Sequence, residues 1–179
     1  MGPNLDAMNL MVNISANYPL LYNFTLLLSA FLGFCMGMWV LVMLVQAYVT
    51  QTIPKEKFNW GLAAPAMLIS SSMMALTTTL FMVSASILDV GGGSLFPPVA
   101  ITGGLTPDKM LGMFAEQTVR FLGVIFGLWG LVEMFMSRTP DGDRTKIWSG
   151  VIRLCVGGAL VRAREFGNLF GGMGDVFFR

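Results

Sequence analysis

The chain has 179 residues, of which 55% are hydrophobic and only 12% are charged, and its mean hydropathy is +0.70. An average soluble domain carries about 25% charged residues, so this composition indicates a membrane protein. Eleven basic against ten acidic residues leave a net charge of +1, which does not indicate a dedicated nucleic-acid binder. The chain has no histidine, which excludes Ser-His and Cys-His nucleophile pairs, and we expect no enzymatic activity.

The two cysteines, Cys35 and Cys155, each lie alone inside an apolar stretch. This placement argues against a disulfide framework and against a CxxC metal or redox site. We therefore predict that both are small buried hydrophobic residues.

Two long apolar stretches occupy the first half of the chain. No charged residue lies between Asp6 and Lys55, and about 20 apolar residues suffice to span a bilayer, so residues 19–50 predict a first transmembrane helix. The apolar run is too long for a signal peptide and no basic segment precedes it, so we expect no cleavage. Residues 61–88 are also uncharged and predict a second span.

Residues 89–106 are rich in glycine and proline and predict a loop. Thr106 and Pro107 then form a helix start signal, which predicts a third helix over residues 107–137. After a turn, residues 146–168 predict a fourth helix whose apolar part is short, so both a spanning and an interfacial or protein-buried helix remain open. With a glycine-rich tail at 169–179, residues 1–179 read as a single membrane-embedded, all-α domain.

The basic residues of the short connections predict the orientation. Lys55 and Lys57 lie in the first connection, and the third holds Arg138, Arg144 and Lys146. Cytoplasmic loops carry an excess of Lys and Arg, so we expect both connections in the cytoplasm and the Gly/Pro loop outside.

Hydroxyl residues form two rows at seven-residue spacing in the predicted second span. The rows are Ser70, Thr77 and Ser84, and Ser72, Thr79 and Ser86. Residues seven apart fall on one helix face, and small hydroxyl residues allow close helix approach in lipid. Helix packing is the main interpretation of these rows, and the lining of a hydrophilic pore is the alternative.

Three charged residues interrupt the predicted third helix. Glu116 and Arg120 are spaced for an ion pair along one helix. Glu133 is 17 residues beyond Glu116, about 260° around the helix, so it needs water, a headgroup or a residue of another helix. We rank Glu133 as the charge that bonds elsewhere.

The predicted fourth helix carries a stripe of small and cationic residues. At 100° per residue Gly150, Arg153, Gly157, Arg164 and Asn168 fall within about 60° of one another, whereas Arg162 points the other way. Salt bridging or snorkelling at an interface is one interpretation, with Glu116 or Glu133 as partner of Arg153. Contact with a lipid phosphate or a translocated substrate is the other.

The second half of the chain resembles a known family. The helix Ala115-Glu-Gln-Thr-Val-Arg-Phe-Leu-Gly, the Gly/Pro/Asp turn, Trp148-Ser-Gly-Val-Ile-Arg-Leu-Cys-Val-Gly-Gly and Phe166-Gly-Asn-Leu-Phe-Gly are similar to the IcmC (DotE) family. The resemblance covers residues 106–172 best. It implies a small membrane protein of type IVB secretion and plasmid conjugation systems, with other subunits of such a system as partners.

The sequence thus predicts a non-enzymatic structural subunit that self-assembles into a membrane channel element or a pilus-like filament. Its expected partners are its own copies, other secretion or conjugation subunits and membrane lipid, with transported DNA or protein contacted only indirectly. We expect the bacterial inner membrane as its location, with departure into an extracellular filament left open. No cofactor is expected, with bound phospholipid left open. A stand-alone channel or transporter is the alternative, which the lack of an inverted repeat disfavours.

Overall fold

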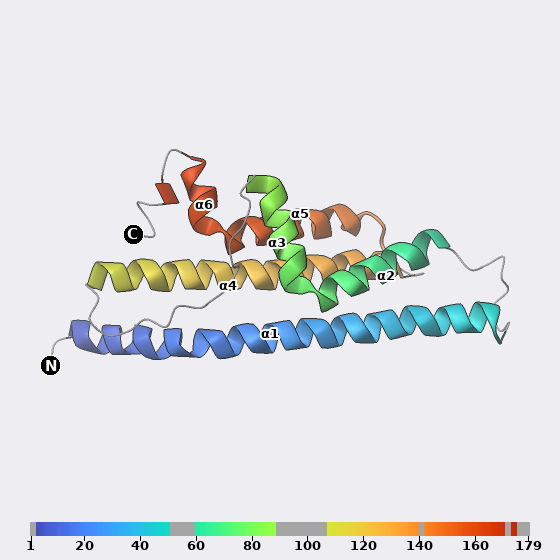
Figure 1. Ribbon diagram of the computed structural model, residues 1–179, viewed down its shortest axis with the longest axis horizontal. Helices are drawn as coiled ribbons and strands as arrows, with labels where there is room; N and C mark the ends of the chain where they lie inside the picture. Colours follow the sequence, from blue (N-terminus) through green and yellow to red (C-terminus); the bar gives the residue numbers. More distant parts are fainter. Residues whose placement is uncertain (1–2, 51–59, 89–106, 140–141, 171–172, 175–179) are drawn as a thin grey trace.

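The computed structural model describes residues 3–50, 60–88, 107–139, 142–170 and 173–174. The elements are, in order, α1 (Pro3–Tyr48), α2 (Trp60–Met74), α3 (Leu76–Leu88), α4 (Pro107–Met136), α5 (Lys146–Val161) and α6 (Ala163–Asn168). Every element in the described ranges is a helix (Figure 1), which confirms the predicted all-α class. The predicted loop at 89–106 and most of the tail at 169–179 lie outside the described residues.

The long helices α1 and α4 lie side by side and run in the same direction (Figure 1). Near their N-terminal ends the Tyr18 hydroxyl lies 2.6 Å from Thr118 Oγ1. Farther along, the rings of Trp39 and Phe135 meet edge to face with their centroids 6.0 Å apart. The two helices therefore stay in contact over most of the length of α4.

Helix α1 begins well before the predicted first span at 19–50. Proline lacks the N–H for helical bonding, yet Pro19 lies inside the continuous helix. Tyr18 and Tyr22 on either side of it are buried against Phe121 of α4. These contacts across the bundle explain why the helix continues through a position that its own sequence disfavours.

The predicted second span at 61–88 is wrong as a single straight helix, because α2 and α3 meet at 99°. At the break the Thr79 hydroxyl donates to the carbonyls of Ser72, 3.0 Å away, and Ala75, 3.1 Å away. The hydroxyls of Ser71 and Ser72 both donate to the carbonyl of Leu68. The bond from Thr79 to the Ser72 carbonyl crosses the break and joins the end of α2 to the start of α3.

The predicted fourth helix at 146–168 is also broken. Arg162 leaves helical geometry with φ −113° and ψ 47°, and separates α5 from α6. Its side chain is buried, with the guanidinium carbon 5.1 Å from the centre of the Phe81 ring on α3. The side chain of Arg162 thus contacts α3 at the position where the helix is interrupted between α5 and α6.

Two helices are long and apolar enough to cross a membrane, at Asn9–Tyr48 in α1 and Lys109–Met136 in α4. The α2–α3 pair would make a third only as a bent span. The predicted set of three long helices therefore reduces to two straight ones, because the break near Ala75 divides the third. Helix α5 has 16 residues, fewer than the roughly 20 that a bilayer needs.

The buried side chains of α1 form one stripe, with half-buried residues such as Leu26 and Leu32 beside it and exposed residues on the opposite face. Ser15, Tyr18, Tyr22, Thr25, Ser29 and Val40 belong to this stripe. Cys35 on α1 and Cys155 on α5 are both exposed and free, so their predicted burial is wrong. Each cysteine lies on the exposed face of its helix. Because both faces of these helices are apolar, the sequence does not show which face is buried.

Candidate functional site

The ion pair between Glu133 and Arg153 is the centre of the candidate site. Glu133 Oε2 on α4 lies 2.9 Å from Arg153 Nη1 on α5, and also accepts a hydrogen bond of 3.1 Å from the Ser149 hydroxyl. The side chains are 17% exposed for Glu133 and 36% exposed for Arg153. Of the partners considered for Arg153, the structure supplies Glu133 of the same chain. Of the three alternatives left open for Glu133, namely water, a headgroup or another helix, it shows a residue of another helix.

Glycines bring α4 and α5 close enough to form this pair. A Cβ on Gly157 would lie 2.6 Å from the Gly127 nitrogen and 2.7 Å from the Gly123 oxygen. A Cβ on Gly150 would lie 2.7 Å from the Gly130 oxygen. Only the absence of side chains permits backbones to approach so closely in a helix pair. Gly150 and Gly157 are therefore packing positions, as predicted for them.

A second ion pair joins Glu116 and Arg120 along α4, as their spacing predicts. It lies beside the contact with α1, where the Tyr22 hydroxyl donates to the Gln117 carbonyl at 3.3 Å. The exposed fractions are 16% for Glu116 and 27% for Arg120. Both ion pairs keep charges on α4 neutralised within the chain, in a helix long and apolar enough to cross a membrane.

The predicted stripe of small and cationic residues does not continue past α5. Arg164 and Asn168 belong to α6, which follows the break at Arg162. Arg164 is exposed, whereas Arg162, expected to point away from the stripe, is 5% exposed and lies against α3. The prediction of one continuous charged face is therefore wrong, because the helix on which it was drawn bends.

The two hydroxyl rows are likewise divided between different contacts. Ser70 packs against α1, where a Cβ on Gly37 would lie 2.8 Å from its hydroxyl oxygen. Ser84 is buried against α5, where a Cβ on Gly158 would lie 3.3 Å from its nitrogen. Ser72 and Thr79 stabilise the bend, and Ser86 is exposed and donates to the Met82 carbonyl. Thr77 is half-buried between the two buried serines of its row.

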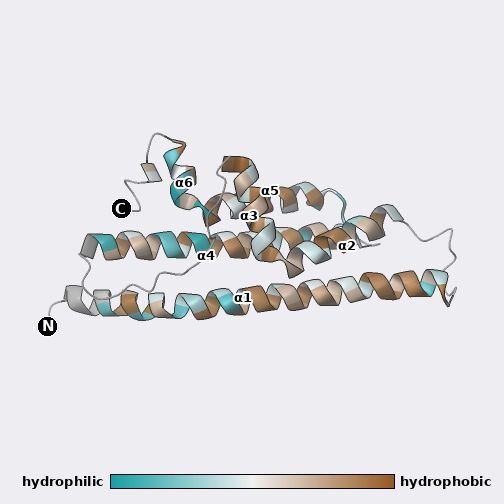
Figure 2. Ribbon diagram, viewed as in Figure 1, coloured by the Kyte–Doolittle hydropathy of each residue, from teal (hydrophilic) through white to brown (hydrophobic). Residues whose placement is uncertain are grey.

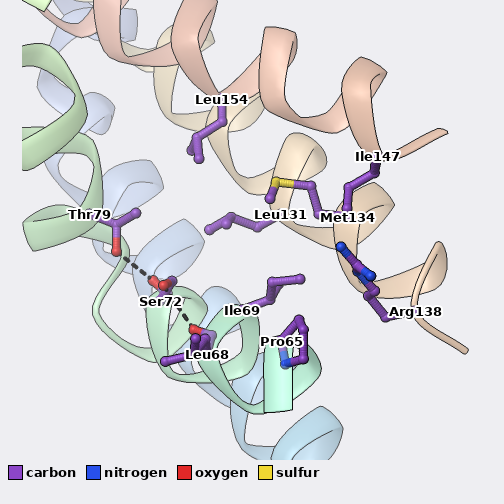
Figure 3. Close-up of a pocket in the computed structure, with 10 residues that line it drawn as sticks. All are labelled: Pro65, Leu68, Ile69, Ser72, Thr79, Leu131, Met134, Arg138, Ile147 and Leu154. Carbon is purple, nitrogen blue, oxygen red and sulfur yellow. Dashed lines mark hydrogen bonds between the residues drawn. The ribbon is translucent and has the colours of Figure 1, made fainter. Parts of the chain in front are cut away.

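The sequence did not predict the roles of two polar residues, Ser29 and Arg138. The buried Ser29 hydroxyl donates to the Met73 carbonyl at 2.6 Å and joins α1 to α2. Arg138, just beyond the end of α4, lines a cavity between α2, α4 and α5 (Figure 3). Nothing in the sequence distinguishes Ser29 from the other hydroxyl residues. Arg138 could have been singled out, because it is the first basic residue after the apolar run of α4.

The loop before α5 holds one titrating group with a shifted pKa. Hydrogen bonds from the Thr145 hydroxyl and backbone N–H hold the pKa of Asp143 below its ordinary value of 3.8. The described residues contain no group of three His, Cys, Asp or Glu side chains that could hold a metal ion. The Glu133–Arg153 ion pair and the glycine contacts bind α4 and α5 to one another.

The fold and the site define an all-helical protein with helices of membrane-spanning length and with ion pairs formed inside the chain. No protein-family profile, curated protein or solved structure matches this chain.

Proposed function

We propose that this chain is a non-enzymatic structural subunit of a conjugative or type IVB secretion apparatus in the bacterial inner membrane. In this proposal copies of the chain assemble through α1 into a channel element or a pilus-like filament. The resemblance of residues 106–172 to the IcmC (DotE) family suggests the apparatus. The exposed face of α1 supports the assembly and is the observation that carries the proposal.

That face is a stripe of large apolar side chains at alternating spacings of four and three residues. The α1 stripe consists of Leu20, Phe24, Leu27, Phe31, Phe34, Met38, Leu41 and Val45, all exposed in the isolated chain. A repeat of 3.5 residues is the spacing at which helices pack knobs into holes along a common seam. The stripe therefore has the periodicity of a helix-pairing surface.

Lipid alone is a poor partner for so long a helix. The uncharged segment Asn9–Tyr48 has 40 residues, which at 1.5 Å per residue extends about 60 Å. The hydrocarbon core of a bilayer is about 30 Å thick, and even a tilt of about 40° leaves some 46 Å along the membrane normal. Large apolar residues are exposed near both ends, at Leu10 and Val49. Protein contacts are the natural cover for the excess length.

The stripe also contains a recess that suits a neighbouring side chain. Phe24, Leu27, Leu28 and Phe31 border a shallow, open groove beside Ala30 on the surface of α1. The small Ala30 lies beside the larger side chains and provides the kind of hole that a knob from a facing helix fills.

Figure 2 shows that the C-terminal half of α1 is mainly hydrophobic, whereas hydrophilic residues gather in the N-terminal half of α4 and in α6.

The alternative, a stand-alone channel or transporter, is less well supported. Polar pathways through membrane proteins are marked by ionisable residues that face a cavity. In the described chain Glu133 bonds Arg153 and Glu116 bonds Arg120, so both acids of α4 within its span have partners inside the protein. A pore would therefore need several copies, and flux through liposomes containing monomers alone would favour the alternative.

Cysteine cross-linking in native membranes tests the assembly. In a background with Cys35→Ser and Cys155→Ser, Phe31→Cys on the α1 stripe should give dimers with a short bis-maleimide. Ile152→Cys on α5 is the matched control, because Ile152 is 61% exposed and Phe31 is 62% exposed. Equal cross-linking at both positions would indicate random collision and would contradict assembly through α1.

Transfer assays test the apparatus. Deletion of the coding sequence should abolish transfer of a mobilisable plasmid or secreted protein, and the wild-type chain should restore it. The double variant Leu27→Ala/Phe31→Ala, which shortens the stripe, should restore it poorly, while Ile152→Ala should restore it fully. Normal transfer after the deletion would contradict the proposed function.

A further inference from the structure

An open pocket of about 300 Å³ is lined by residues of α2, the first turn of α3, α4 and α5 (Figure 3). Its walls are mostly apolar, with Ile69 from α2, Leu131 and Met134 from α4, and Ile147 and Leu154 from α5. The pocket opens to the surface, and about 300 Å³ is the lower end of the range for ligand pockets. A space of this size among apolar side chains calls for an apolar occupant.

The two hydroxyl groups of the cavity wall do not alter its apolar character. Thr79 Oγ1 donates to the carbonyls of Ser72 and Ala75, and Ser72 Oγ donates to the Leu68 carbonyl (Figure 3). Each hydroxyl proton is thus already engaged by the backbone at the bend. A ligand inside the cavity meets methyl and methylene groups and gains little from polar atoms of its own.

Arg138 places a cation at one end of this apolar space. It follows the candidate span Lys109–Met136 of α4 by two residues, where a helix of spanning length would reach the membrane surface. Figure 3 shows its guanidinium directed towards Met134 and Ile147. Its Nε is buried and has no hydrogen-bond acceptor, and no described carboxylate forms an ion pair with it. A buried donor without an acceptor is costly, so an acceptor beside Arg138 would stabilise the site.

We propose that an anionic phospholipid binds here, with an acyl chain in the cavity between α2, α4 and α5 and its phosphate on Arg138. A guanidinium matches the oxygens of a phosphate with paired donors, and the cavity removes a chain from water or bulk lipid. In the turn after α4, Arg144 and Lys146 are balanced by Asp141 and Asp143, so Arg138 leaves the turn with a net charge of +1. This positive balance favours an anionic over a zwitterionic headgroup.

Measurement of lipid retained by the purified protein tests this site. The full chain is extracted in mild detergent, and bound phospholipid is counted by native mass spectrometry. We expect about one phospholipid per wild-type chain. Arg138→Leu should lower retention about tenfold, as expected for loss of a charge-assisted hydrogen bond. Arg144→Leu is the matched control in the same turn and should retain the lipid, because Arg144 is exposed and does not line the cavity.

Two further variants separate the site from a general effect on folding. Ile147→Trp should fill the cavity and expel the lipid while leaving Arg138 in place. Arg138→Lys keeps a cation and should retain more lipid than Arg138→Leu. Circular dichroism and gel filtration identify any variant that does not fold, and the comparison is then made with the others.

Nanodiscs and free phosphate distinguish the sources of the anion. Delipidated wild-type protein in phosphatidylglycerol nanodiscs should have a higher thermal midpoint than in phosphatidylcholine nanodiscs, and Arg138→Leu should remove the difference. Millimolar inorganic phosphate should not displace the bound lipid. Displacement by phosphate, equal midpoints in the two lipids, or wild-type retention by both Arg138→Leu and Ile147→Trp would overturn the proposal.

Discussion

The contact between α4 and α5 and the contact between α1 and α2 hold helices together in different ways. In the first, the backbones meet at Gly123, Gly127 and Gly157, and an ion pair joins Glu133 to Arg153. In the second, Gly37 faces the Ser70 side chain, and the buried bond between the two helices runs from a hydroxyl to a carbonyl. Both contacts include a glycine that meets backbone, Gly157 in the first and Gly33 in the second, where a Cβ would lie 2.7 Å from the Ser70 carbonyl oxygen. The comparison teaches that the charged half of the chain adds an ion pair to such a contact, whereas the uncharged half adds a hydroxyl-to-carbonyl hydrogen bond.

The largest difference should appear when alanine replaces one glycine in each contact. In Gly157→Ala the new Cβ would overlap backbone atoms of α4, which cannot rotate away, so we expect a loss of about 3 kcal/mol. In Gly37→Ala the near atom is the Ser70 hydroxyl oxygen, which can rotate, and alanine gains up to about 1 kcal/mol in helix propensity. Unfolding in detergent measures both. Equal losses would remove the proposed distinction between a glycine that faces backbone and one that faces a side chain.

The ion pair of the α4–α5 contact gives the second effect. Arg153→Leu should strand Glu133 at a cost of about 2 kcal/mol, the scale for hydrogen bonds to charged groups. Adding Glu133→Gln should recover part of this loss, since the unpaired charge is removed. Denaturant unfolding of the two single variants and the double variant measures the coupling. Additive losses would show that the two side chains do not stabilise each other.

The hydroxyl contact between α1 and α2 should be weaker. Ser29→Ala leaves the Met73 carbonyl without the donor from α1, and we expect a loss of about 1 kcal/mol. Ser86→Ala is the control, because the Ser86 hydroxyl is exposed and bonds within its own helix. Thermal unfolding measures both variants. A loss as large as that of Arg153→Leu would mean that the two kinds of contact are equally strong.

The smallest effect concerns the loop that leads into α5. The Thr145 hydrogen bonds lower the pKa of Asp143 below 3.8, so they favour the charged form in the folded chain. These hydrogen bonds stabilise the folded chain fully when the pH is above the pKa that Asp143 has in the unfolded chain. This stabilisation is lost as the pH falls through the lower pKa that Asp143 has in the folded chain. Asp143→Ala should therefore lower the thermal midpoint slightly at neutral pH. The difference should disappear in acid, and a difference that grew on acidification would contradict this assignment.

Sequence patterns within one segment were enough to predict α4 and one of the two ion pairs. The predicted helix at 107–137 agrees closely with α4, because a proline at the start and a long apolar run act within that segment. The Glu116–Arg120 pair followed from spacing along one helix. For Glu133 the sequence left water, a headgroup and a residue of another helix open as partners. The choice of Arg153 required the approach of α5, which depends on glycines of both helices.

Amino-acid composition by itself determined that this chain is helical and apolar enough for a membrane, and the placement of charges determined which residues needed partners. The tertiary structure decided the bends near Ala75 and at Arg162, the exposure of Cys35 and Cys155, and the position of Arg138 at a cavity. In a uniformly apolar helix, hydropathy does not distinguish the face that packs from the face that stays open. That distinction arises from contacts between residues far apart in the sequence, such as Arg162 on Phe81.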